Sequence, residues 1–389
     1  MSNLFKRTLL ASACVVQAFG LSALAADHSS DAPVTSIYRI GYPVEVSIIG
    51  KELGNAATAQ NTLAVKHYAM GRLAWELAYV MPDHRTAYAG DDGTNRGMFR
   101  FVADRAGDLS SGTLYAAKLT QKTAAGDKNG GKFDISWISF GHASNQEIDS
   151  YIQRGIQFSD MFDAADPSDK KSCTPDFVPS EADGKKECLK LKTANRLGMS
   201  ALQIRNAASR LESLRFAAYV GATTEFRKFE GVTYDPMRKQ MYIAISEISK
   251  AMASGPSLAG IDDDINIATN KCGGVYKLNV NDEFATTSMQ ALVLGKPKTY
   301  EGNLASNTCD LDGIASPDNV VMGLNNDTLI IGEDTDAHQN DVLWAYDLKS
   351  NKLTRIFSTP YGSETTSPWV YKNISDKVDY MITVVQHPC

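Results

Sequence analysis

Short apolar runs separated by turn residues make up most of the chain. Residues 99–102, 113–119 and 133–140 are rich in aromatic, aliphatic and β-branched side chains, and polar or Gly-containing segments separate them. This pattern is typical of β-strands joined by short turns. From residue 226 to the C-terminus the same alternation of short runs and turns resumes. The pattern therefore predicts an all-β scaffold.

The stretch between residues 145 and 220 differs from the rest of the chain. Within residues 194–220, apolar side chains recur at near-helical spacing with Arg and Glu between them, and residues 148–161 carry a second pattern of this kind. Such spacing predicts amphipathic helices. Because strands resume on both sides, we predict a helical insertion around residues 145–220 in the β scaffold.

A unit of two short strands with acidic ends recurs four times. Its copies begin at Glu76, Glu230, Asp318 and Glu364. In the first three copies a second acidic position closes the second strand, 15 to 17 residues later: Asp91 with Asp92, Glu247, and Glu333 with Asp334. The last two starts are 46 residues apart, and the gap before them is 88 residues, close to two such steps. A period of about 40–50 residues is typical of the blades of a β-propeller.

Strand ends that repeat around an axis would bring these carboxylates to one place. Hard cations such as calcium take about six to eight oxygen ligands from carboxylates, Asn side chains and carbonyls. Taken singly, each acidic pair is more typical of a turn, because Asp, Asn and Gly favour turns. Recurrence at equivalent strand ends favours a shared metal site. The run from Asp262 to Asp264 lies in a Gly- and Pro-rich loop, where solvated charge is the first interpretation and calcium binding the second.

Composition and motifs narrow the choice of function. The chain has 389 residues, of which 43% are hydrophobic and 22% charged, which is typical of a globular protein. A net charge of −6 argues against a nucleic-acid surface, which needs a basic stripe. The sequence contains no HExxH, GxSxG or Gly-rich phosphate loop, so zincin, serine-hydrolase and P-loop chemistry have no support.

Residues 1–25 have the features of a signal peptide. Two basic residues precede an apolar run that ends in Ala-Leu-Ala, an A-x-A cleavage site. No later stretch approaches the roughly 20 apolar residues of a membrane span. We therefore expect a periplasmic or secreted protein of bacterial type, with a flexible N-terminus over residues 26–36 and one propeller-like domain over residues 37–389.

Five cysteines follow the predicted cleavage site, and an exported chain is expected to oxidise them to disulfides. Cys173 and Cys188 flank a polar loop, and we predict that they pair. Cys272 and Cys309 are the next predicted pair. Cys389, the last residue given, is left without a partner.

Several short stretches occur in an order and at a spacing that resemble one known family, the PhoX-type alkaline phosphatases. No single stretch is specific to that family, whereas the ordered set, from about residue 65 onward, is fairly specific. The stretches are Gly71-Arg72-Leu73-Ala74-Trp75-Glu76, Tyr88-Ala89-Gly90-Asp91-Asp92, Phe99-Arg100-Phe101-Val102, Ser111-Gly112-Thr113-Leu114-Tyr115, Phe229-Glu230-Gly231-Val232, Ser316-Pro317-Asp318-Asn319, Glu364-Thr365-Thr366-Ser367-Pro368 and Val385-Gln386-His387-Pro388.

This resemblance implies a six-bladed propeller-like fold and metal-dependent hydrolysis of small phosphomonoesters at an axial cluster of Ca²⁺ and Fe³⁺. It implies Glu76 and Glu230 as iron ligands with a part in catalysis. It also implies Lys228 as the cation that holds phosphate, at a place where the family tends to carry Arg, whose two-pronged contact Lys lacks. The remaining metal ligands expected on this basis are Asp91, Asp92, Asp318, Asn319, Asp334 and Glu364.

Two departures from the family affect this expectation. Residues 26–75 contain no cysteine, where the family carries one that binds iron, and the chain is short, as if parts of the first and last blades were absent. These departures predict weaker iron binding and weaker activity, with the calcium sites retained. A non-catalytic calcium-binding propeller and a lactonase-type hydrolase therefore stay open as alternatives. In each case we expect a monomer that binds no nucleic acid.

Overall fold

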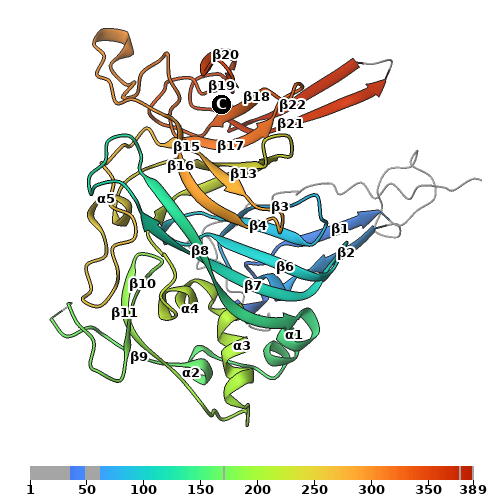
Figure 1. Ribbon diagram of the computed structural model, residues 1–389, viewed down its shortest axis with the longest axis vertical. Helices are drawn as coiled ribbons and strands as arrows, with labels where there is room; N and C mark the ends of the chain where they lie inside the picture. The colour runs from blue at the N-terminus through green and yellow to red at the C-terminus, as the bar shows by residue number, and fades with distance from the viewer. Residues whose placement is uncertain (1–35, 49–61, 170, 376–377, 388–389) are drawn as a thin grey trace, which may run out of the picture.

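The computed structural model describes residues 36–48, 62–169, 171–375 and 378–387. The predicted signal peptide, most of the polar segment after it, and Cys389 lie outside the described residues. Figure 1 shows strands β17 to β22 at one end of the molecule, helices α1 to α4 at the other, and the remaining long strands between them.

Most described strands belong to three antiparallel meanders of four strands each. The first meander contains β3 (Trp75–Val80), β4 (Thr86–Asp91), β6 (Phe99–Arg105) and β7 (Asp108–Gln121). The second contains β13 (Phe229–Asp235), β14 (Gln240–Ile245), β15 (Gly274–Val280) and β16 (Thr286–Leu294). The third contains β17 (Pro317–Met322), β18 (Thr328–Glu333), β19 (Val342–Asp347) and β20 (Lys352–Ser358).

Further strands join or flank these meanders. The long strand β8 (Lys132–Ser144) pairs with both β7 and β16, so the first two meanders form one nine-stranded sheet. Two hairpins are made by β1 (Val44–Ile48) with β2 (Thr62–Lys66) and by β21 (Glu364–Ser375) with β22 (Val378–Gln386). A short pair, β5 (Thr94–Arg96) with β12 (Phe226–Arg227), lies near the start of the second meander.

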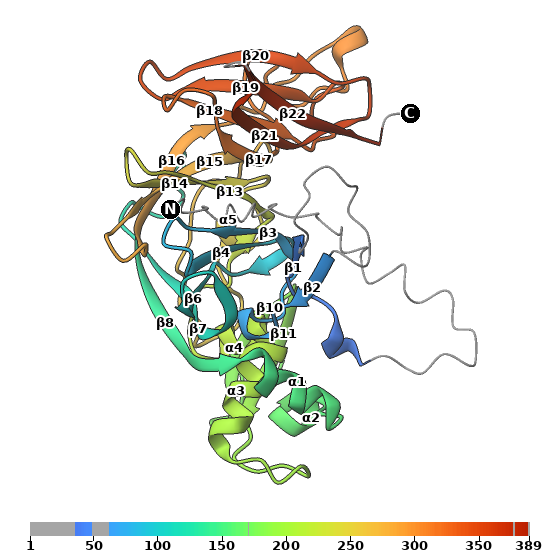
Figure 2. The same cartoon turned by 90° about the vertical axis from the view of Figure 1, so that its right-hand side faces the viewer.

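The first strands of successive meanders come together around a common centre. Strand β13 lies against β3 and β4, β17 lies against β13, and β21 lies against β17 and β18. Figure 2 shows the same succession of layers from the side. The three largest apolar clusters of the described residues fill the spaces: one under the helices, one between the first two meanders, and one between the second and third. Sheets stacked face to face around a centre form the propeller-like arrangement that the sequence predicts.

The predicted insertion contains helices and also a small sheet. Its helices are α1 (Asn145–Gln153), α2 (Phe158–Met161), α3 (Ala201–Leu211) and α4 (Ser213–Tyr219). Its three-stranded sheet, made of β9 (Phe162–Ala165), β10 (Val178–Ala182) and β11 (Lys185–Leu191), was not predicted. The remaining helical segments are α5 (Ala251–Ser254), η1 (Ile37–Arg39), η2 (Tyr68–Met70) and η3 (Gly302–Leu304).

A capping box and a buried arginine fix helix α3 in place. The Ser200 side chain accepts from the backbone N–H of Gln203, and the Gln203 side chain accepts from the backbone N–H of Ser200, which satisfies free donors at the helix start. Near the other end, the fully buried Arg210 donates to the carbonyls of Ala69 and Gly141, 2.8 and 2.6 Å away. The insertion is therefore attached to η2 and to strand β8 through hydrogen bonds as well as apolar packing.

Both predicted disulfides are confirmed. Cys173 is bonded to Cys188, and Cys272 is bonded to Cys309. The first closes the loop between β9 and β11, and the second ties the start of β15 to the segment before β17. Within the described part of the chain, no helix has the length and apolar character needed to cross a membrane.

Candidate metal centre

A β-bulge lies at the acidic start of the repeated unit. The register of β3 with β4 shifts between Trp75 and Ala78, on either side of Glu76. The same shift occurs in β13 around Glu230 and in β17 around Asp318. A bulge leaves residues out of the ladder and re-aims their side chains. The acidic side chains are therefore not held to the strict up-and-down alternation of a regular strand.

Two glycines let the strands that carry these residues approach closely. A Cβ atom at Gly90 would lie 2.2 Å from the carbonyl oxygen of Glu230, and one at Gly231 would lie 2.5 Å from that of Asp318. Only a residue without a side chain fits where another backbone comes so near. Because β4 thus touches β13, and β13 touches β17, their acidic residues are brought to the same place.

Three carboxylates from two meanders converge at this place. Glu76, Asp92 and Glu230 can each present one oxygen so that the three atoms lie within 4.8 Å of one another. Lys228 stands beside them, with Nζ 3.4 Å from Glu230 Oε1 and 3.9 Å from Asp92 Oδ1. The backbone of Lys228 has a left-handed φ of 48°, and its N–H donates to the Gly93 carbonyl at 2.8 Å. We call Glu76, Asp92 and Glu230 the carboxylate trio.

The carboxylate trio lies in a strongly negative environment. Burial, and after it the charge of Asp92, raises the pKa of Glu76 to about 7, although Lys228 acts in the opposite direction. Burial together with the charges of Asp318 and Asp92 raises the pKa of Glu230 well above its ordinary value. Desolvation and like charges disfavour the ionised form of a carboxyl group. A bound cation would relieve both effects.

A second group of predicted residues surrounds the trio. Asp318 has a pKa raised by burial and by the charges of Asp334 and Glu76, and Asn319 Nδ2 donates to Asp318 Oδ1 at 2.8 Å. Burial, followed by the charge of Asp334, raises the pKa of Glu364. Acidic residues at the starts of β17 and β21 therefore act electrostatically on the same group of carboxyls as those of β3 and β13.

Asp91 has a different environment from Asp92, its neighbour. Its Oδ1 accepts from the backbone N–H of Ala74 at 3.0 Å and lies 3.4 Å from Arg96 Nη1. Burial raises the pKa of Asp91 to about 7, while the charge of Arg96 lowers it. Its other oxygen, Oδ2, is buried and has no hydrogen-bond partner among the described residues.

These observations fit a cation. Oδ2 of Asp91 and Oδ1 of Asp92 are both buried without a hydrogen bond in the described part of the structure. A buried polar atom that is left unpaired costs free energy, so such atoms call for a partner. The site supplies carboxylate and amide oxygens, which are the ligands that hard cations take.

The second acidic position of the repeated unit does not always lie beside the carboxylate trio. Glu247 pairs with Arg227, 3.1 Å away, and accepts from Ser249 Oγ at 2.7 Å. Its place near Glu230 is taken by Ser246, whose Oγ lies 3.2 Å from Glu230 Oε1 and 3.1 Å from the Pro317 carbonyl oxygen. The acidic residue that ends this unit in the sequence, Glu247, therefore comes one position after Ser246, the residue that contacts Glu230 in the structure.

Sequence reasoning also missed Asp341. Its carboxyl is buried, and Oδ2 accepts from the backbone N–H of Thr335 at 3.0 Å. Burial, and after it the charge of Glu333, raises its pKa to about 8, and the charges of Asp334 and Glu364 add to the effect. No repeat or motif marks this residue, because it reaches the site from a loop before β19.

Comparison with known proteins assigns the chain to a family. The structure of Pseudomonas fluorescens PhoX in complex with vanadate, a transition state analogue, matches it with a TM-score of 0.56 at 19% identity, covering 90% of this chain and 53% of that one. The chain thus spans about half the length of that relative. Saccharomyces cerevisiae Sqt1 and a luciferin-regenerating enzyme match at 8% and 9% identity with TM-scores of 0.24, too low to inform the fold; they cover 80% and 78% of this chain and 69% and 80% of their own.

Among curated proteins, none is significantly similar to this sequence. The family described as Alkaline phosphatase PhoX matches residues 35–388, which include the whole of the carboxylate trio and the residues around it. The chain therefore belongs to the PhoX alkaline phosphatase family.

Proposed function

We propose that this chain is a metal-dependent phosphomonoesterase that binds calcium and iron at the carboxylate trio. Proteins of its family are metal-dependent. The observation that carries the proposal is the convergence of Glu76, Asp92 and Glu230 within 4.8 Å, with the ammonium group of Lys228 beside them. Metal ligands and a cation at one point can together receive the charge of a phosphate group.

The ligand set divides into a centre and a periphery. Glu76, Asp92 and Glu230 would hold the central ion or ions, and Asp91, with an unpaired buried oxygen, would complete that side. The other ligands would be Asp318, Asn319, Asp334 and Glu364. When bound, calcium and iron supply positive charge that offsets the negative charge of a phosphate group.

Lys228 is the residue that we propose binds the phosphate. Burial lowers its pKa, but the charges of Glu230, Asp92 and Asp334 raise it more, so the net pKa is above the ordinary value and the side chain stays an ammonium. An ammonium donates hydrogen bonds to phosphate oxygens without the fixed geometry of an arginine. Lys228 would therefore orient the substrate and hold its proton throughout the reaction.

Ser246 is a positioning residue in this proposal. Its hydroxyl lies within hydrogen-bond distance of both Glu230 and the carbonyl oxygen of Pro317, so it connects β14 to β17 beside the site. Such a contact holds a metal-binding carboxylate in one orientation. Its removal should weaken the metal site less than removal of Glu230 itself.

We also propose an exported, periplasmic or secreted location. The predicted signal peptide and the two disulfides support this, because disulfides persist in oxidising compartments. A monomer remains our expectation for the assembly.

The test is hydrolysis of p-nitrophenyl phosphate by the purified full chain, supplied with Ca²⁺ and ferric iron, and again after chelation. We expect turnover that requires metal and that Glu230→Gln lowers by at least about 100-fold, as removal of a charge-stabilising group commonly does. Glu247→Gln, which removes a neighbouring carboxylate outside the trio, is the matched control and should keep turnover.

Either of two experimental outcomes would support a different function for this chain. Folded protein that binds calcium but hydrolyses no phosphomonoester would support a non-catalytic calcium-binding propeller. Turnover of a chromogenic lactone, without turnover of the phosphate ester, would support a lactonase-type hydrolase.

A further inference from the structure

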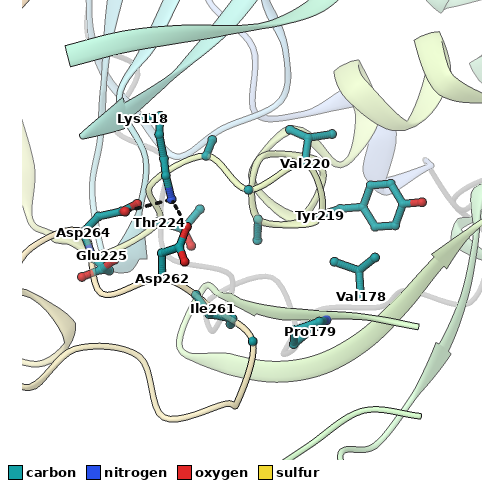
Figure 3. A pocket seen from close by; sticks show the side chains of 14 residues that line it. Lys118, Val178, Pro179, Tyr219, Val220, Thr224, Glu225, Ile261, Asp262 and Asp264 are labelled. Atoms are coloured by element: carbon teal, nitrogen blue, oxygen red, sulfur yellow. Dashed lines mark hydrogen bonds and ion pairs between the residues drawn. The ribbon is translucent and has the colours of Figure 1, made fainter. Parts of the chain in front are cut away.

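A cavity of about 300 Å³ lies where the helical insertion meets the first meander. Its walls come from β7, from the start of β10, from the end of α4 with the segment after it, and from the loop around residues 260–264 (Figure 3). None of its lining residues belongs to the carboxylate trio or to the residues around it. It is therefore a separate feature of the molecule.

One side of the cavity is acidic. Lys118 Nζ lies 2.8 Å from Asp264 Oδ1 and 3.1 Å from Asp262 Oδ2. Glu225 is a third carboxylate in the wall, and it is buried. Burial raises the pKa of Glu225 to about 8, so near pH 7 the two carboxylates of Asp262 and Asp264 oppose one ammonium and the lining carries a net charge of about −1. One lysine therefore does not neutralise this side.

The end of helix α4 adds to the negative potential. Residues 218–222, which comprise the last two residues of α4 and the segment after it and include Gly221 at a φ of 80°, line the cavity. The carbonyl end of a helix carries partial negative charge and favours cations. The direction of this effect is the same as that of the Asp262 and Asp264 carboxylates.

The other side of the cavity is apolar. Figure 3 shows Val178, Pro179, Tyr219 and Val220 together, apart from the group formed by Lys118 and its acidic partners. Ile261 lies between the two groups in that view. A ligand that fills the cavity would therefore contact charge at one end and carbon surface at the other.

The walls are held by hydrogen bonds of their own. Thr223 Oγ1 donates to Asp264 Oδ2 at 2.5 Å and accepts from the backbone N–H of Leu119 at 2.9 Å. The Glu225 carboxylate accepts from the backbone N–H groups of Asp264 and Ile265, at 2.9 and 3.0 Å. Side chains fixed before binding lose little entropy when a ligand arrives.

We propose that this cavity binds a small amphipathic organic cation, that is, a protonated amine carried on a short apolar body. Its ammonium group would lie against Asp262 and Asp264 beside the end of α4, and its apolar body against Val178 and Val220. The volume is at the lower end of the range of ligand pockets, which suits a molecule of about ten heavy atoms or fewer. This site is independent of the proposed phosphatase function.

The test is calorimetric titration of the full chain, saturated beforehand with Ca²⁺, with hexylammonium, and separately with hexanoate and hexanol. We expect saturable binding of hexylammonium, at least ten-fold tighter than that of hexanoate or hexanol. Asp262→Asn should weaken binding about three-fold, the size expected for one largely exposed charge. Asp263→Asn, which removes the same charge at a neighbouring residue outside the lining, should leave the affinity unchanged.

A second pair of variants tests the apolar side. Val178→Phe should fill the cavity and weaken hexylammonium binding at least ten-fold, with circular dichroism as the check on folding. If that variant does not fold, Ile261→Trp on the loop replaces it. Equal binding of hexanoate, or hexylammonium binding that the filled cavity leaves unchanged, would overturn the proposal.

Discussion

Glu230 lies at the start of the first strand of one repeated unit, and Glu333 lies at the end of the second strand of another. Both are buried, yet their surroundings are opposite. Glu333 has four donors around it: the backbone N–H groups of Ala315 and Val342, the indole N–H of Trp344, and His338 Nδ1, at 2.7 to 3.0 Å. Glu230 has Ser246 and Lys228, and it faces the carboxylates of Glu76, Asp92 and Asp318.

The comparison shows that burial of an acidic residue does not by itself indicate a metal site. A carboxylate whose oxygens are all paired with donors stabilises the fold, because removing it would leave those donors unpaired. A carboxylate surrounded by other carboxylates destabilises the protein until a cation arrives. The number of donors, and not the depth of burial, separates Glu333 from Glu230.

The largest expected effect is a loss of stability when Glu333 is replaced. Its replacement by Gln puts an amide nitrogen against groups that donate, so we expect the free energy of unfolding to fall by about 3 kcal/mol. Urea unfolding followed by circular dichroism measures this. The metal content per folded molecule should stay at the level of the unaltered protein. A loss of metal without a loss of stability would mean that Glu333 is a metal ligand and not a structural carboxylate.

The next effect is on pH dependence. Glu76 has a folded-state pKa raised to about 7, so between its ordinary value and about pH 7 the folded protein binds more protons than the unfolded chain. The stability of metal-free protein should therefore fall across this window as the pH rises, and level off above it. Thermal unfolding with a chelator present measures the trend, and Glu76→Gln should make it shallower.

A smaller effect is expected at Lys228. Lys228→Met removes the ammonium group from the proposed phosphate site and should lower kcat/KM for p-nitrophenyl phosphate by about ten-fold, mostly through KM. Lys228→Arg keeps the charge and should restore most of the loss. Equal loss in both variants would mean that the backbone of residue 228, and not its charge, matters.

The smallest expected effect is a gain of stability when Glu230 is replaced, opposite in sign to the loss expected at Glu333. In metal-free protein, at pH values where Glu230 is ionised, Glu230→Gln removes a charge that repels its neighbours, so stability should rise by up to about 1 kcal/mol. The same urea unfolding experiment measures it. A fall of the size expected for Glu333→Gln would show that Glu230 is a structural carboxylate.

Much of this arrangement could be predicted from the sequence, for a physical reason. Strand periodicity and turn residues are local, so the repeated strands and the starts at Glu76, Glu230 and Asp318 were predictable. The bulges at those residues were not, because they depend on how each strand pairs. For this reason Glu247 is an acidic end in the sequence but an ion-pair partner of Arg227 in the structure.

Other features depend on contacts between distant segments. The sheet of β9 to β11 joins the two sides of a disulfide-closed loop, and its short polar strands carry no clear alternation. Asp341 reaches the site from a loop, and Ser246 replaces an acidic residue at an equivalent strand end. No local pattern marks either residue.

The most direct test of the account is the metal content of three purified proteins after dialysis: the unaltered chain, Glu230→Gln and Glu247→Gln. The account predicts bound calcium and iron in the unaltered chain and in Glu247→Gln, and little or no metal in Glu230→Gln while that variant remains folded. Equal metal content in Glu230→Gln and the unaltered chain would contradict the claim that the carboxylate trio is the metal site.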